Sequence, residues 1–224
     1  MLRRFSSVGF VCALLSGAAL AGCGGSASQS PGAGSSGQSR SNGSGSQGQG
    51  PGGAGPLLQT PLFSTSYPAG WHRTLIHRKH AALYLLGSPG ARVSELGIPS
   101  RGGIGVTVSY VPARALEHQL PDAPTAAPIE LLKKLVGVPV PAAQATLVSA
   151  PHAATLGGAA AAGATVRYTY HGVGNLQENL VTRQSATVVL LELDTQPDRQ
   201  AAGEAALQTM LSSWRWISPT TGAV

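Results

Sequence analysis

The chain has 224 residues and a formal net charge of +6, but only 11% of its residues are charged. Positive charge this sparse, with no dense run of Lys and Arg, argues against a nucleic-acid-binding protein. With two cysteines the chain cannot form a disulfide-rich scaffold, so a folded domain must be stabilised by its apolar core.

The first 22 residues are typical of a secretion signal. Arg3 and Arg4 form a short basic start, and an apolar stretch follows over residues 8–20. This stretch is too short to cross a bilayer as a stable helix, which needs about 20 apolar residues. We therefore expect residues 1–22 to be a signal peptide.

The signal ends in Leu20-Ala21-Gly22-Cys23, which resembles the lipobox of bacterial lipoproteins. The resemblance implies cleavage between Gly22 and Cys23, a diacylglyceryl group on the thiol and often an acylated new amine. Two acyl chains make a stable anchor, whereas one gives only reversible membrane binding. Cys12 would leave with the signal, so the mature chain would have no disulfide and no cysteine-based metal site or nucleophile. We expect a protein held by lipid on the extracytoplasmic side of a cell membrane.

Residues 23–56 are predicted to form a flexible tether. From residue 24 to residue 56 the chain is almost wholly Gly, Ser, Gln, Pro and Ala, and Arg40 is its only charge. Such a segment buries nothing that could offset the entropy lost on ordering, so it is expected to be disordered, with an end-to-end distance of roughly 30 Å. One domain is predicted over residues 57–218, followed by a short tail over residues 219–224.

Alternating apolar and polar side chains predict β-strands in this domain. The expected strands cover residues 63–67, 82–87, 104–111, 165–170, 175–183 and 187–193. Short turns rich in Pro and Gly separate several of them, which implies a largely antiparallel sheet. The segment Thr187–Leu193 is apolar on both faces except at Glu192, as expected of a central strand.

Two segments have the periodicity of helices. Residues 128–136 begin with Pro and carry acidic and basic side chains at the ends that suit the helix dipole. The second helix is expected over residues 197–213 and opens with Thr195-x-x-Asp198, a pattern similar to a capping box. Leu207, Met210 and Trp214 lie on one side of this second helix and are expected to enter the core. The predicted class is α+β, an antiparallel β-sheet with helices packed on it.

Two motifs resemble known domains. Tyr-Pro-Ala-Gly-Trp at residues 67–71 resembles the opening of domains in the PsbP-like superfamily, and Ser-Ser-Trp-Arg-Trp at residues 212–216 resembles their end. Lipid-anchored members, including the LpqN-like lipoproteins, also follow a signal and a linker. The resemblance implies an α/β/α sandwich and a binding or assembly protein that is not an enzyme. It implies no particular site residues.

Three groups of side chains are candidates for chemistry. The basic segment after Trp71 predicts either a solvated hairpin or an anion-facing patch made by Arg73, His77, Arg78, Lys79 and His80. A metal site here is disfavoured, because no Asp, Glu or Cys lies nearby in the sequence. Glu192 and Asp194 share one face of a strand. Such a carboxylate pair can do acid–base work, but we expect these two to end the strand at the surface, with Arg183 or Arg167 as a partner. The three tryptophans either line a groove for an apolar ligand or pack as structural aromatics where the sheet meets a helix; they are Trp71, Trp214 and Trp216.

Three functions follow as hypotheses. The first is a non-enzymatic binding or assembly module that engages an envelope protein, lipid or glycan, with no cofactor. The second is a carrier of a small apolar or lipid ligand between sheet and helix. The third is a hydrolase, which would need a pocket that joins a histidine to a carboxylate.

Overall fold

A computed structural model describes residues 55–78, 80–135 and 145–217. The predicted signal peptide, Cys23, the tether up to residue 54 and the C-terminal tail lie outside the described residues, so their assignments stay predictions. No helix within the described ranges is long and apolar enough to span a membrane.

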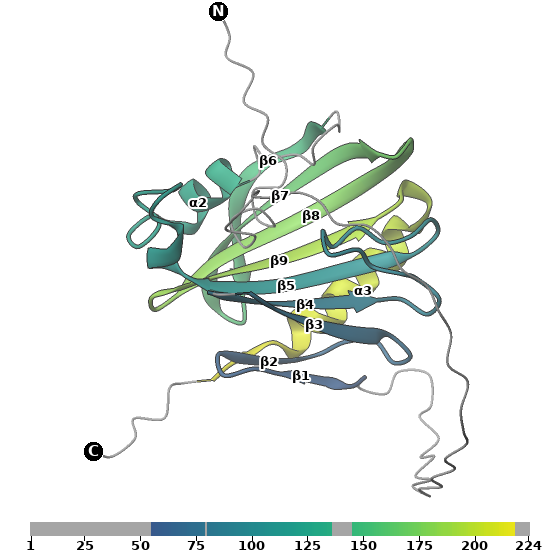
Figure 1. The fold of residues 1–224 in the computed structure, drawn as a ribbon, viewed down its shortest axis with the longest axis horizontal. Helices are drawn as coiled ribbons and strands as arrows, with labels where there is room; N and C mark the ends of the chain where they lie inside the picture. The colour runs from purple at the N-terminus through teal and green to yellow at the C-terminus, as the bar shows by residue number, and fades with distance from the viewer. Residues whose placement is uncertain (1–54, 79, 136–144, 218–224) are drawn as a thin grey trace, which may run out of the picture. The chain divides into compact units, whose positions relative to one another are not determined.

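A seven-stranded antiparallel sheet forms the centre of the domain (Figure 1), with strand order β3-β4-β5-β9-β8-β7-β6. Its strands are β3 (His72–Arg78), β4 (Ala81–Gly87), β5 (Ile104–Pro112), β6 (Ala145–Leu156), β7 (Ala159–Tyr170), β8 (Val173–Gln184) and β9 (Thr187–Thr195). Tight turns join β6, β7, β8 and β9 in succession, and β5 pairs with β9 at the centre.

A smaller sheet and two helices complete the domain. The small antiparallel sheet has the order β1-β2-β10 and consists of β1 (Leu57–Gln59), β2 (Phe63–Ser66) and β10 (Arg215–Trp216). The helices are α2 (Pro128–Leu135) and α3 (Gln200–Ser213), with short 3₁₀ turns η1 (Ala113–Leu116) and η2 (Pro197–Arg199).

The two faces of the large sheet are covered by different elements. Because side chains alternate along a strand, β9 sends Leu191 and Leu193 into one buried cluster, and Val188 and Leu190 into another. The first cluster includes side chains from α3 and the small sheet, and the second includes side chains from α2 and η1. The domain is therefore an α/β/α sandwich.

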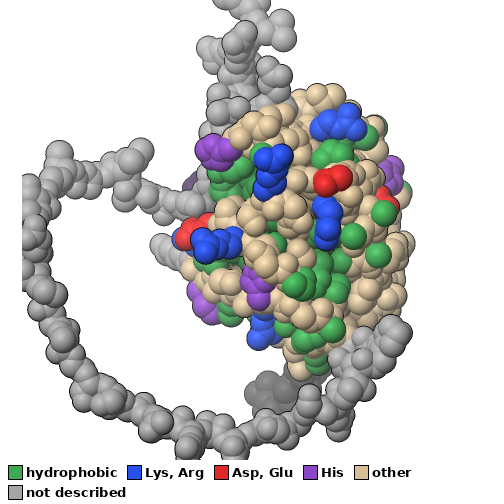
Figure 2. All heavy atoms as spheres, turned by 90° about the vertical axis from the view of Figure 1, so that its right-hand side faces the viewer, with side chains coloured by type: hydrophobic (Ala, Val, Ile, Leu, Met, Phe, Trp, Pro, Cys, Tyr) green, Lys and Arg blue, Asp and Glu red, His purple; other side chains and the backbone are tan. Residues whose placement is uncertain are grey.

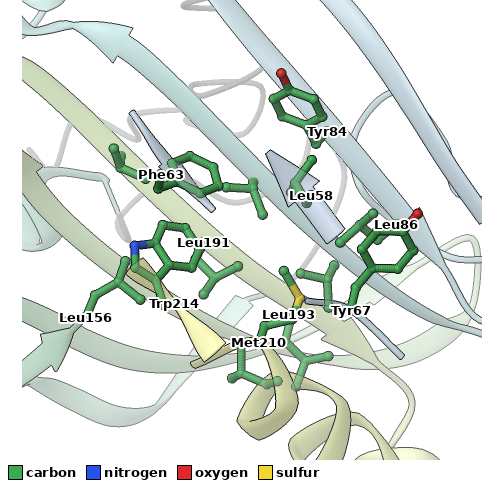
Figure 3. Close-up of a cluster of buried hydrophobic side chains, with 14 of the residues drawn as sticks. Leu58, Phe63, Tyr67, Tyr84, Leu86, Leu156, Leu191, Leu193, Met210 and Trp214 are labelled. Carbon is green, nitrogen blue, oxygen red and sulfur yellow. The ribbon is translucent and has the colours of Figure 1, made fainter. Parts of the chain in front are cut away.

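The core on the α3 side is built around aromatic rings. Figure 3 shows Phe63 and Trp214 face to face within a set of buried apolar side chains. Their ring centroids lie 4.2 Å apart at an interplanar angle of 16°, and both side chains are fully buried. Met210 on α3 is also fully buried, which confirms the apolar stripe predicted for this helix.

The structure confirms the predicted α+β class and the antiparallel sheet with helices packed on it. It adds strands β1, β3, β6 and β10, which the sequence pattern did not predict. The capping-box prediction is wrong. Helix α3 begins after η2 with Arg199 at its N-cap, and neither start has a side-chain cap hydrogen bond. The hydroxyl of Thr195 donates instead to the carbonyl of Gln196.

Candidate functional site

An open hollow of about 680 Å³ lies where the C-terminal end of α3 meets the turn between β6 and β7. We call it the α3 hollow. Its lining residues are Thr155, Gly157 and Gly158 near the turn, Gln208, Leu211 and Ser212 on α3, and Trp214, Arg215 and Trp216 after it. Its volume falls within the range of roughly 300–1,000 Å³ that is typical of small-molecule sites.

The β6–β7 turn shapes the hollow through two consecutive glycines. Gly157 and Gly158 both have positive φ angles, +55° and +81°, which side chains other than glycine rarely adopt. A Cβ atom placed on Gly157 would lie 2.5 Å from Cδ1 of Trp214 and 3.0 Å from Nε1 of Trp216. A Cβ atom on Gly158 would meet nothing within 4 Å. Glycine at residue 157 therefore lets the turn approach the two indole rings.

The two tryptophans at the hollow differ in how their ring nitrogens are bonded. Trp216 donates its Nε1–H to the carbonyl of Leu156 at 2.9 Å. The Nε1 atom of Trp214 is buried and has no hydrogen-bond partner. Figure 3 places this nitrogen on the Leu156 side of the buried cluster. The third tryptophan, Trp71, is not among the lining residues of the hollow.

Arg215 provides the only charge among the lining residues. Its Nη1 donates to the carbonyls of Ser212, at 3.2 Å, and Trp214, at 2.7 Å. Both carbonyls lie at the C-terminal end of α3, where no following helical turn provides an N–H group for them to accept from. The side chain thus fixes the chain at the exit of the helix while its charge stays at the surface.

A second cluster of polar side chains lies on the opposite face of the large sheet, around the predicted carboxylate pair Glu192 and Asp194, and its members Tyr168 and Gln177 were not predicted from the sequence. Asp194 is 2% exposed and accepts hydrogen bonds from the hydroxyl of Tyr168 and from Nε2 of Gln177, the latter at 2.9 Å. Burial raises the pKa of Asp194 to about 7, although both hydrogen bonds lower it. Burial, followed by the charge of Asp194, raises the pKa of Tyr168 well above its ordinary value.

Glu192 extends this cluster along β9. It is partly buried and lies opposite Thr107 of β5 and Asn179 of β8. No hydrogen bond or ion pair joins it to any described residue, and burial followed by the charge of Asp194 raises the pKa of Glu192 to about 8. The prediction that both carboxylates end a strand at the surface beside an arginine is wrong for Asp194. Arg183 donates instead to the carbonyl of Pro124.

Three residues of the predicted anion-facing patch lie on β3 and are distributed over both of its faces. Arg73 and His77 pair with Leu86 and Ala82 of β4 and so share one face of β3. Arg78 lies on the other face, and its Nη2 pairs with Oε2 of Glu95 at 2.6 Å.

His80 lies in the turn after β3, and Lys79 lies outside the described residues. On the face drawn in Figure 2, Lys and Arg side chains stand apart from one another and do not form one continuous basic area. Anion binding by this segment stays a prediction.

The other hypotheses can be compared with the same geometry. Between the sheet and α3, the described side chains pack into one apolar cluster, in which Met210 and Trp214 are fully buried. The α3 hollow has neither a histidine nor a carboxylate among its lining residues. Among the described residues, no group of three or more His, Cys, Asp and Glu side chains could hold a metal.

Fold and hollow together define a class, an α/β/α sandwich on an antiparallel sheet with an open site at the end of its C-terminal helix. The chain matches no protein-family model and no curated protein. Solved structures do match it. One is LpqN of Mycobacterium tuberculosis, described as involved in cell envelope biogenesis, with a TM-score of 0.44 and 17% identity over 75% of this chain and 87% of LpqN.

Two further solved structures match the chain. The cyanobacterial PsbP protein of Synechocystis sp. PCC 6803 matches with a TM-score of 0.39 and 16% identity over 77% of this chain and 99% of that protein. The Ran-binding protein Mog1p of Saccharomyces cerevisiae matches with a TM-score of 0.37 and 12% identity over 68% of this chain and 89% of Mog1p. Structural neighbours of the chain thus include LpqN and a PsbP protein.

Proposed function

We propose that this chain is a lipid-anchored, extracytoplasmic binding module that engages a component of the cell envelope through the α3 hollow, without catalysing a reaction. The observation that carries the proposal is the hollow itself. It combines indole surface with polar side chains that can orient a ligand, as binding sites generally do. Trp216 provides apolar area, and Gln208 and Ser212 provide polar groups at the rim.

The anchor is supported by the sequence Leu20-Ala21-Gly22-Cys23 after a basic start and a short apolar stretch. Lipid on Cys23 would hold the domain at the membrane, and the glycine- and serine-rich tether would let it reorient there. The hollow would then sample partners within reach of the membrane surface.

Replacing Cys23 with Ala should move the protein from the membrane fraction to the soluble fraction, because the thiol that carries the diacylglyceryl group is gone. The measurement is fractionation of cells that express the full chain, with immunodetection of both fractions. Cys12→Ala is the matched control, since it removes the other cysteine within the predicted signal and should leave the protein with the membranes. Membrane association that survives Cys23→Ala would refute the anchor.

The binding role predicts a captured species that depends on the hollow. The full chain, extracted gently from its own membrane, should carry a bound envelope molecule in native mass spectrometry. Ser212→Tyr should remove it, because Ser212 is exposed and lines the hollow, so a ring there occupies the space of the ligand. Thr209→Tyr is the matched control, since Thr209 is exposed on the same helix outside the lining. Equal capture by both variants would contradict the assignment of the hollow.

A further inference from the structure

We infer that the α3 hollow binds a ligand through an oxyanion, a phosphate or a carboxylate, with Arg215 as the residue that pairs with it. This inference rests on the proposed function, because it names the ligand class of the same hollow. It is carried by the charge of the lining, by the unused donors of Arg215 and by the unpartnered indole nitrogen of Trp214.

The charge of the lining is positive only. Arg215 is the one charged residue among those that line the hollow, and no Asp or Glu lies among them. A guanidinium next to an open site with no competing carboxylate favours a negatively charged ligand. The nearest element on which an internal partner would be expected, the C-terminal half of α3, has no acidic side chain after Glu204.

Arg215 keeps donors available. Both of its hydrogen bonds to the protein use Nη1, which donates to the carbonyls of Ser212 and Trp214. Nε and Nη2 have no protein partner within the described residues, and Arg215 is exposed. The two bonds at Nη1 restrict the guanidinium plane, while the free edge retains the fork geometry that matches a carboxylate or a phosphate.

The hydrogen bonds from Arg215 to the carbonyls of Ser212 and Trp214 reduce the negative field at the end of α3. The C-terminal end of a helix carries partial negative charge, which disfavours an anion nearby. Arg215 donates to two carbonyls at this end of α3, so its cation offsets part of that field at the hollow. The guanidinium of Arg215 then determines that the hollow prefers an anion.

The indole of Trp214 adds a donor that lacks an acceptor. Its Nε1 is buried without a hydrogen-bond partner, in contrast to Nε1 of Trp216, which is bonded to Leu156. A buried donor left unpaired costs about 1–3 kcal/mol. The adjacent ring atom Cδ1 of Trp214 faces the turn at Gly157, which also lines the hollow. Nε1 is buried beside this wall of the hollow, so its N–H signal would report a ligand that binds there.

The test is a titration of the full chain in a neutral detergent, with the tryptophan nitrogens isotope-labelled for NMR. The probes are inorganic phosphate, glucuronate, glucose, and vesicles of phosphatidylglycerol or phosphatidylcholine. The indole N–H signal of Trp214, assigned with a Trp214→Phe variant, reports an acceptor that reaches the hollow. We expect the anionic probes to move this signal and the neutral ones to leave it in place.

Arg215→Gln should weaken the response to the anionic probes by about tenfold or more, the loss expected for one charge-assisted pair. Arg199→Gln is the matched control, because Arg199 is exposed, lies before the first residue of α3 and has no side-chain cap bond to lose. A response to phosphatidylglycerol but not to glucuronate identifies a lipid headgroup as the source. A response to glucuronate but not to phosphatidylglycerol identifies a glycan as the source. Both outcomes support the inference.

Three results overturn the inference. Glucose could move the Trp214 signal as strongly as glucuronate, Arg199→Gln could weaken binding as much as Arg215→Gln, or no probe could move the signal. Failure of this inference can be distinguished from failure of the proposed function. If native mass spectrometry finds a neutral species whose capture depends on Ser212, the hollow remains a binding site while its anion preference is refuted.

Discussion

The domain should lose up to about 6 kcal/mol of its free energy of unfolding as the pH rises from about 5 to about 8.5. The groups responsible are Asp194 and Glu192, which lie two residues apart on one face of β9. Their pKa values are raised to about 7 and about 8, from 3.8 and 4.5, chiefly because burial disfavours the charged form.

The sign follows from the proton balance. Below about pH 3 both carboxyl groups are mostly protonated in the folded and the unfolded chain, so they contribute almost no pH dependence. As the pH rises further, the unfolded chain releases its protons while the folded domain keeps them. The unfolded state is then favoured progressively until the pH passes the folded pKa values of Asp194 and Glu192.

Urea unfolding measured at a series of pH values checks this prediction. Glu192→Gln should flatten the dependence and should be more stable than the parent chain above about pH 7, because it keeps the shape without the buried charge. Asp198→Asn, an exposed carboxyl in η2, should leave the slope unchanged. Stability that is flat across this range, or that rises with pH, would show that the cluster is not buried as described.

Gly157→Ala should destabilise the domain by about 2–4 kcal/mol. The added methyl group would lie 2.5 Å from Cδ1 of Trp214, and that ring is stacked on Phe63 in the filled core, so it cannot move aside easily. The positive φ of Gly157 adds backbone strain to the steric conflict. Chemical denaturation of the purified variant gives the measurement.

Gly158→Ala provides the matched control for this substitution. It has the same change of side chain, also at a positive φ, but its methyl group would meet nothing within 4 Å. It should cost only the backbone term, about 1–2 kcal/mol. The difference between the two variants in free energy of unfolding therefore measures the contact between the turn and Trp214. Equal losses of stability in the two variants would mean that this contact is not tight.

The fold was predictable where burial leaves a pattern in the sequence. Strand β5 alternates Val106 and Val108 with polar residues or glycine, and β9 is apolar on both faces, so both were recognised. Strands β3 and β6 lie at the two edges of the sheet, and most of their side chains are exposed. Such strands are held by backbone hydrogen bonds and one neighbour, so no apolar alternation marks them.

The candidate site depends on contacts that the sequence pattern does not encode. Trp214 and Trp216 were recognised as candidates to line a groove. Their opposite wall, the turn at Gly157 and Gly158, lies more than fifty residues earlier and meets them only through the fold. Asp194 was misplaced for a similar reason, because its partners Tyr168 and Gln177 come from two other strands. Pairing across a sheet decides whether a carboxyl near the end of a strand is buried.

The two edges of the large sheet also bear on how copies of this domain behave when crowded together. An unprotected edge strand can pair with the same edge of another molecule and start aggregation. Here β6 breaks its own ladder, with register shifts on both sides of Ser149 and with Pro151 lacking an amide hydrogen to donate. At the other edge, β3 carries the exposed Arg73, and its charge would repel the same residue of a neighbouring molecule that paired with this edge. Both edges therefore oppose sheet extension between neighbouring molecules, and the domains can be densely packed on a surface and stay separate.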